Sequence, residues 1–212
     1  MAEKPTVTAV QKALDSAKKR NFVETVELAI NLRDVDLSIP KNRIQEDVVL
    51  PSGRGKNIKI CVIGGGELAL KAKDVADLVI SSDELGAFAD DKKQAKKVAN
   101  DIDYFIAEAS LMAAVGKRLG TILGPRGKMP KPIAPGADPA QMIDQLRRSV
   151  TIRTKDKKTF HVPVGTVEMS AEDIAENIDV VLGRVEGRLE KGRHNMSSAY
   201  VKTSMGPAEK VM

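Results

Sequence analysis

The sequence has few of the side chains on which most catalytic and metal sites depend. One cysteine, two histidines and no tryptophan occur among its 212 residues, and aromatic residues make up 3% of them. A lone cysteine inside an apolar run, as Cys61 is, excludes an internal disulfide and indicates a core residue in a reducing compartment. The histidines have no cysteines or carboxylates at the spacings of metal ligands. We therefore predict no metal site and no catalytic residue.

Long hydrophobic runs are also missing. No apolar segment reaches the length of a membrane span, and the N-terminus lacks the apolar core of a signal peptide, so we expect a cytoplasmic protein without membrane contact. The chain instead carries charge: 34 basic and 29 acidic residues give a net charge of +5, which favours an anionic partner. Because aromatic residues are scarce, the pattern favours the backbone and shape of folded RNA over stacked single-stranded bases.

Both ends of the chain show the same pattern, which is short strands of alternating polarity and one amphipathic helix each. The first fifty residues contain too few elements for a core of their own, so we infer that they pack with the last sixty. The expected elements are a helix after Pro5, strands over 22–32 and 43–50, a hairpin of 150–154 with 160–164, a helix capped by Ser170, and a strand over 198–205 followed by a short tail.

The middle of the chain alternates strands with helices, which predicts a parallel sheet covered by helices. The expected strands are 58–63, 78–81 and 104–107, and the expected helices are 67–73, 91–101, 111–119 with Ser110 as cap, and 138–148 with Asp138 as cap. We therefore predict an α+β domain formed by residues 1–53 and 150–212, interrupted by an inserted α/β domain over residues 54–149.

A basic segment without acids runs from Gly116 to Gly136, with five glycines, four prolines and five basic residues. Its prolines exclude helix and inner strand, so it is predicted to be a surface loop. Such a loop can hold phosphates with backbone N–H groups and lysines, and the alternative is a solvated connector. Walker-type nucleotide binding is not expected, because Met129 stands where that motif needs Ser or Thr.

A second motif supports an alternative function. The sequence from Gly64 to Ala69 follows a strand and opens a helix, and it fits the G-x-G-x-x-A pattern of dinucleotide-binding turns. Asp83 follows the next strand, where a ribose-binding acid is sought. The turn of Gly64, Gly65 and Gly66 thus allows a nucleotide-cofactor-binding enzyme as the alternative, although adjacent glycines are common at such turns and Asp83 can equally cap a helix.

Four motifs together resemble one family. The segment 116–132, GKRLGTILGPRGKMPKP, is similar to the signature of the first-numbered protein of the large ribosomal subunit, the ribosomal protein L-one family, in its archaeal form. FVETVE at 22–27, FHVPVG at 160–165 and TSMGP at 203–207 resemble that family's N-terminal strand, hairpin and C-terminal segment. The resemblance covers essentially the whole chain and implies a discontinuous α+β domain interrupted by a Rossmann-like three-layer α/β domain.

The resemblance also implies a function. Such a protein is not an enzyme and needs no cofactor. It binds large-subunit ribosomal RNA at the mobile stalk beside the exit site, helps deacylated tRNA leave, and represses translation by binding its own messenger RNA. It is expected in the cytoplasm on the ribosome, and as a monomer outside it.

Charge and resemblance favour different sites. Residues 54–149 hold 16 basic and 12 acidic residues, against 18 and 17 in the two ends, so charge alone selects the middle. The resemblance places the main site on the ends, where hydrogen bonds can read RNA shape. The predicted RNA-binding residues there are Phe22, Thr25, Glu27, Arg153, Lys155, His161, Ser204, Met205, Gly206 and Pro207. The secondary set in the middle is Lys117, Arg118, Arg126, Lys128 and Lys131.

Overall fold

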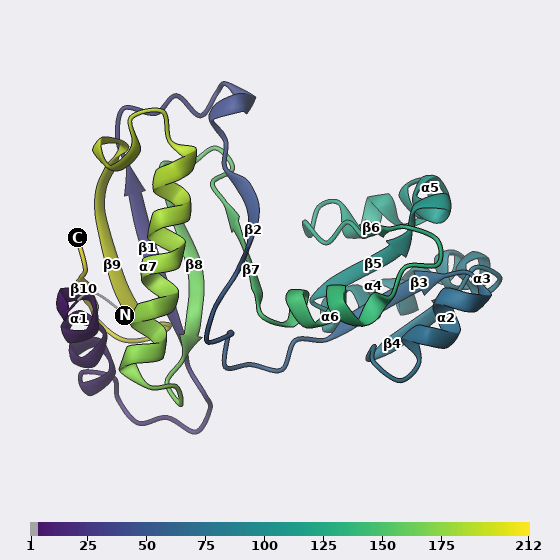
Figure 1. Cartoon of the computed structure of the whole chain (residues 1–212), viewed down its shortest axis with the longest axis horizontal. Coiled ribbons are helices and arrows are strands. Elements are labelled where there is room, and N and C mark those ends of the chain that lie inside the picture. Colours follow the sequence, from purple (N-terminus) through teal and green to yellow (C-terminus); the bar gives the residue numbers. More distant parts are fainter. Residues whose placement is uncertain (1–3) are drawn as a thin grey trace. The chain divides into compact units, whose positions relative to one another are not determined.

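The computed structural model describes residues 4–212, which form two compact units (Figure 1). The terminal unit comprises the chain up to Lys56 together with Arg148–Met212, and the inserted unit comprises Asn57–Arg147. The protein is thus of mixed α/β class with several sheets, one of them parallel. The predicted domain boundaries lie within three residues of these limits, and independent folding of each unit stays a prediction.

The terminal unit contains a four-stranded antiparallel sheet in the order β10-β9-β1-β8. Strand β1 spans Thr25–Leu32, β8 spans Thr159–Thr166, β9 spans Met196–Thr203 and β10 spans Ala208–Lys210. Residues buried to at least 95% alternate with half-buried ones along β1, as the period of two in the sequence predicts. Leu28 lies opposite Val162 of β8 and Val201 of β9, so one face of the central strand is fully apolar.

Two helices cover that apolar face: α1, Lys4–Asp15, and α7, Ala171–Arg188 (Figure 1). Ser170 caps α7 as predicted, since its hydroxyl accepts the Asp173 N–H at 3.1 Å. Ile174 and Ile178 of α7 are fully buried against the sheet. Burying such a side chain contributes about 1.5–3 kcal/mol, so this stripe holds the unit together. A short 3-10 helix, η3 (Gly192–Asn195), links α7 to β9.

The predicted hairpin of 150–154 with 160–164 is wrong. Strand β7, Ser149–Arg153, pairs with β2, Gln45–Val49, in a separate two-stranded sheet, while β8 pairs with β1. Thr154 explains the change of partner, because it is buried and its hydroxyl accepts the Ile44 N–H at 3.0 Å. The 3-10 helix η1, Pro40–Asn42, comes just before β2.

A second correction concerns the end of the chain, because the short tail expected after Pro207 forms a strand. Strand β10 pairs with β9, and the backbone of Ala199 exchanges hydrogen bonds with Val211 and Met212 at 2.9–3.2 Å. Both terminal side chains pack against the core. The sequence did not show this because the tail has no apolar alternation of its own.

The inserted unit is built on a parallel sheet in the order β4-β3-β5-β6. This confirms the parallel sheet predicted for the middle of the chain. Separate apolar clusters lie on the two faces of the sheet, and Cys61 is buried in one of them, where desolvation raises the pKa of its thiol to about 12. The strands are β3 (Ile60–Gly64), β4 (Leu78–Ser81), β5 (Tyr104–Glu108) and β6 (Lys131–Ile133). Helices α3 (Glu84–Asp90), α4 (Lys92–Asp101) and α5 (Met112–Leu123) cover one face, and α2 (Gly66–Ala72) and α6 (Pro139–Arg147) cover the other.

Three predictions for this unit need correction. Helix α3 was not predicted, and Ser110 lies in the 3-10 helix η2, Ala109–Leu111, where its hydroxyl donates to Glu108 instead of capping α5. The basic segment is only partly a loop, since α5 runs on to Leu123 and β6 begins at Lys131. The buried Leu119, Ile122 and Leu123 continue the helix despite the glycines, and Pro132 is tolerated because β6 is an edge strand.

Candidate nucleic-acid interface

The face of the four-stranded sheet that points away from α1 and α7 is polar. Asn31 of β1 connects the neighbouring strands, because its amide donates to the Ser198 hydroxyl of β9 at 2.9 Å and accepts from the Thr159 hydroxyl of β8 at 2.7 Å. The side chains here are half-buried or exposed. This face is therefore a flat, hydrogen-bonding surface of the kind that can approach a nucleic-acid backbone.

Four predicted residues meet at the end of this face where β1 begins. The Ser204 hydroxyl lies 3.2 Å from both the Thr25 carbonyl oxygen and Oε1 of Glu27, so its one proton is donated to either. The other carboxylate oxygen of Glu27, Oε2, lies 3.8 Å from Nδ1 of His161. The Glu27 side chain is 32% exposed and keeps free lone pairs. This Glu27 cluster can accept hydrogen bonds from a ribose 2′-OH or a base amine.

The turn after β9 places apolar groups beside the Glu27 cluster. The Ser204 N–H donates to the Thr25 carbonyl at 3.0 Å, and the Gly206 N–H donates to the Thr203 carbonyl at 3.1 Å, which closes the turn. Met205, at the tip of this turn, is 63% exposed, and Pro207 after it is also exposed. Phe22, which precedes β1, is 58% exposed. An exposed large apolar side chain next to polar acceptors, as Met205 is beside Ser204, is typical of a binding surface.

The buried side chain of Glu24 holds this turn in place. Its side chain is 4% exposed, Oε2 accepts the Met205 N–H at 3.4 Å, and Oε1 is paired with the Arg20 guanidinium. The Thr203 hydroxyl, then the Met205 N–H and the Arg20 charge, lower the pKa of the Glu24 carboxyl against the opposing effect of burial. Sequence reasoning missed Glu24, because its partner Met205 is 181 positions away.

Gly206 is needed for packing within the turn. A Cβ atom at this position would lie 2.3 Å from the Thr203 hydroxyl oxygen. Its backbone is not in the left-handed region, so the constraint is the close contact alone. A larger residue here therefore disturbs the turn before any RNA is bound.

Arg153 and Lys155 lie apart from the Glu27 cluster. Arg153 is exposed on β7 opposite Gln45, and Lys155 follows in a left-handed turn with φ of 48°. Across residues 4–212, no hydrogen bond or ion pair connects either side chain to Glu27 or Ser204. They stand near the start of β8, whereas Thr25 pairs with Thr166 at its end.

The predicted basic residues of the inserted unit divide into two groups. Lys128 donates to the Ala99 and Ile102 carbonyls at 3.0 and 2.6 Å, and Arg126 donates to the Asn100 side chain and the Ile122 carbonyl at 2.9 Å each. These contacts satisfy the ends of α4 and α5. The Lys131 ammonium lies 5.1 Å from the ring centroid of Tyr104. Lys117 and Arg118 are exposed on α5.

The glycine turn of the alternative hypothesis already holds an anion. The Glu108 carboxylate accepts the Gly65 N–H at 2.9 Å, at the start of α2, which has only 7 residues. The Ser110 hydroxyl and then the Gly65 N–H lower the pKa of Glu108, so it is ionised at neutral pH. A pyrophosphate would have to displace this carboxylate. The geometry therefore does not favour a dinucleotide at this turn.

Within residues 4–212, no group of three or more His, Cys, Asp or Glu side chains is arranged to hold a metal ion, and no helix is long and apolar enough to cross a membrane.

The open face adds candidate contact residues that sequence reasoning did not single out. These are Asn31 and Thr159, together with Ser198, Tyr200 and Lys202 of β9. Their alternation with buried residues was visible in the sequence, but the pairing that brings the three strands together was not.

Comparison with known proteins gives a consistent result. A sequence model of the ribosomal protein L1p/L10e family matches residues 13–207. The large ribosomal subunit protein uL1 of Methanocella arvoryzae is 53% identical over 213 residues, 100% of both chains. The proteins of the same name from Picrophilus torridus and Haloquadratum walsbyi are each 52% identical, and the alignments cover 95% and 97% of this chain and 94% and 98% of theirs. The similarity thus extends well beyond the four motifs.

Proposed function

The chain belongs to the ribosomal protein L1p/L10e family, in its archaeal form, and we propose that it binds large-subunit ribosomal RNA through the open sheet face of the terminal unit. Its relatives are named as proteins of the large ribosomal subunit, so its role is structural and non-enzymatic and its place is on the ribosome. The family identified from the motifs, and the prediction that the chain is not an enzyme, are confirmed.

The Glu27 cluster is the observation that carries this proposal. Glu27, Ser204 and His161 present acceptors and an imidazole ring on the open face, with Met205 exposed in the turn after Ser204 and Phe22 exposed before β1. A carboxylate at the centre is repelled by phosphate, so this end of the face reads 2′-OH groups and base edges. Arg153 and Lys155, farther along the unit, then meet phosphates of the same RNA.

The finer functions are part of the same proposal. We place the target RNA at the mobile stalk beside the exit site, where the protein assists release of deacylated tRNA. Lys117 and Arg118 are the exposed cations available to that tRNA. A stalk-like fold in the protein's own messenger RNA would occupy the same face and repress translation, with the protein acting as a monomer.

Affinity for a stalk fragment of ribosomal RNA tests the interface. Met205→Ala and Glu27→Gln are each expected to weaken binding by about tenfold, which is about 1.4 kcal/mol, with an unchanged thermal midpoint. The control is Glu168→Gln, which changes an exposed acid in the same unit. Unchanged affinity in both variants, or equal losses for an unrelated RNA, would remove the face from the proposal. Competition by the messenger leader and by deacylated tRNA tests the two finer functions.

A further inference from the structure

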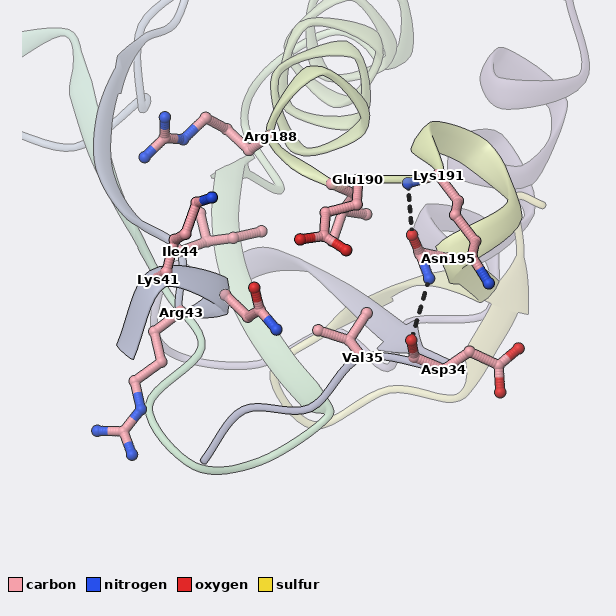
Figure 2. A pocket seen from close by; sticks show the side chains of 11 residues that line it. Asp34, Val35, Lys41, Arg43, Ile44, Arg188, Glu190, Lys191 and Asn195 are labelled. Carbon is pink, nitrogen blue, oxygen red and sulfur yellow. Dashed lines mark hydrogen bonds between the residues drawn. The ribbon is translucent and has the colours of Figure 1, made fainter. Parts of the chain in front are cut away.

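A cavity of about 220 Å³ lies in the terminal unit, at the end of β1 opposite the Glu27 cluster (Figure 2). Three segments form its walls: residues 34–35 after β1, residues 41–44 before β2, and residues 188–191 with Asn195 from the end of α7 onward. Val35, Ile44 and Leu189 line it with apolar surface and are each at most 9% exposed. The proposed RNA face does not include this cavity.

The walls are fixed by internal hydrogen bonds. Asn195 is 3% exposed, its Oδ1 accepts the Lys191 N–H at 2.8 Å, and its Nδ2 donates to the carbonyls of Arg33 and Asp34 at 3.1 and 3.4 Å. Arg43 donates to the Leu37 carbonyl and pairs with Asp156. The cavity is therefore formed before a ligand arrives, which lowers the cost of binding.

The polar groups of the cavity are of both signs. Figure 2 shows Lys41 and Arg188 on one side, Lys191 on the other, and the Glu190 carboxylate between them. Throughout the described part of the chain, no hydrogen bond or ion pair engages the ammonium groups of Lys41 and Lys191 or the Glu190 carboxylate. Four basic and two acidic side chains line the cavity, but Arg43 pairs with Asp156 and Arg188 lies 3.5 Å from the Glu46 carboxylate. The unengaged ammonium groups and the Glu190 carboxylate therefore favour a ligand that carries both a negative group and hydrogen-bond donors.

We propose that this cavity binds a guanosine 5′-monophosphate group. The apolar lining accepts a flat base, and a carboxylate can accept two adjacent N–H donors, which guanine offers on its Watson–Crick edge. Glu190 takes this role, and the phosphate meets the Lys41 ammonium at the exposed rim. Asn42 adds a second acceptor: its amide nitrogen donates to the Asp36 carbonyl, and its amide oxygen serves as an acceptor for the ligand. The volume suits one base and its ribose, below the roughly 300–1,000 Å³ of drug-sized pockets.

Nuclear magnetic resonance titration of the full chain tests the proposal with GMP, AMP and ribose 5-phosphate. GMP is expected to produce saturable shifts of the backbone amides of Val35, Leu189 and Asn195. Lys41→Ala should weaken GMP about tenfold. Glu190→Gln should abolish the preference for GMP over AMP without weakening AMP. Lys12→Ala and Glu168→Gln, which alter exposed charges elsewhere in the unit, should change neither.

The contrary outcomes are specific. Ribose 5-phosphate binding as tightly as GMP, or an intact GMP preference in Glu190→Gln, would show that no base is recognised. Shifts confined to other residues would place the ligand elsewhere. A second arm replaces GMP with a short single-stranded RNA that carries a 5′-phosphorylated guanosine. Competition with GMP for the cavity identifies the source as an RNA chain, and binding of GMP alone identifies a free nucleotide.

Discussion

Glu24 and Glu27 are three residues apart on the same strand entry, yet their surroundings are opposite. Glu24 points into the unit and holds the turn after β9, whereas Glu27 lies on the open face with lone pairs to spare. Period-two alternation places residues an odd number of positions apart on opposite faces, and β1 begins between the two acids. One carboxylate therefore holds the turn, and the other lies on the face that we propose for RNA binding.

The Glu24 carboxyl is expected to make stability depend on pH. Its folded-state pKa lies below the ordinary value of 4.5, so the ionised form stabilises the fold. That contribution is fully present above about pH 4.5 and is lost as the pH falls through the folded-state pKa. Glu24→Gln should lower the free energy of unfolding at pH 7 and flatten its decline between pH 5 and 3. Urea unfolding across that range measures both, and an equal decline in the two proteins would contradict the assignment.

Gly206 is expected to limit stability through Thr203. Gly206→Ala should lower the free energy of unfolding by about 1–3 kcal/mol, because the new Cβ would lie 2.3 Å from the Thr203 hydroxyl oxygen. In a Thr203→Ala background the same change should cost clearly less. Thermal unfolding of the four proteins gives this coupling. Additive losses would place the strain elsewhere, and RNA affinity at this turn is best compared in the Thr203→Ala background.

At the scale of elements, the basic segment combines two tasks that its composition does not separate. Lys128 and Arg126 hold the C-terminal ends of α4 and α5, while Lys117 and Arg118 stay on the exposed side of α5. Carbonyls at helix ends need donors, and cations meet that need well. Net charge along a segment thus overstates the number of cations available to phosphate.

This division predicts two different results. Replacing Lys117 and Arg118 by Ala should lower the slope of log affinity for RNA against log salt by up to roughly 0.9 per lost duplex contact, with stability unchanged. Lys128→Ala should leave that slope unchanged and lower the stability of the inserted unit, since two carbonyls lose their donor. Salt-dependent binding and thermal unfolding distinguish the pair. The reverse pattern would return Lys128 to the RNA contacts.

At the scale of the whole molecule, the chain leaves the terminal unit and returns to it at neighbouring points. The Leu50 N–H donates to the Arg148 carbonyl at 2.9 Å, and the Arg148 side chain donates to the Pro51 carbonyl. The terminal unit also has its own apolar core, drawn from α1, α7 and both of its sheets. An insertion whose ends meet in this way can be removed without opening that core.

We therefore expect a protein lacking residues 57–147, with a short Gly/Ser bridge from Lys56 to Arg148, to fold and to bind the stalk RNA. Cooperative unfolding and RNA affinity are the measurements. The matched control carries Met205→Ala in the same shortened chain, which should lose about tenfold in affinity. A shortened chain that unfolds cooperatively and does not bind would move the main site to the inserted unit.

The sequence by itself determined most of the strands and helices, because periodicity, caps and proline effects act between residues close in the chain. It missed α3, β6 and β10. It predicted β4 at 78–81, the Ser170 cap and the parallel sheet, and its four motifs identified the family. Only the tertiary structure decided that β7 leaves β8 for β2, that the tail becomes β10, that Glu108 fills the glycine turn and that Lys128 caps α4. Each of these depends on groups far apart in the sequence, whose pairing is set by packing and by the need to satisfy buried polar atoms, and no local pattern encodes it.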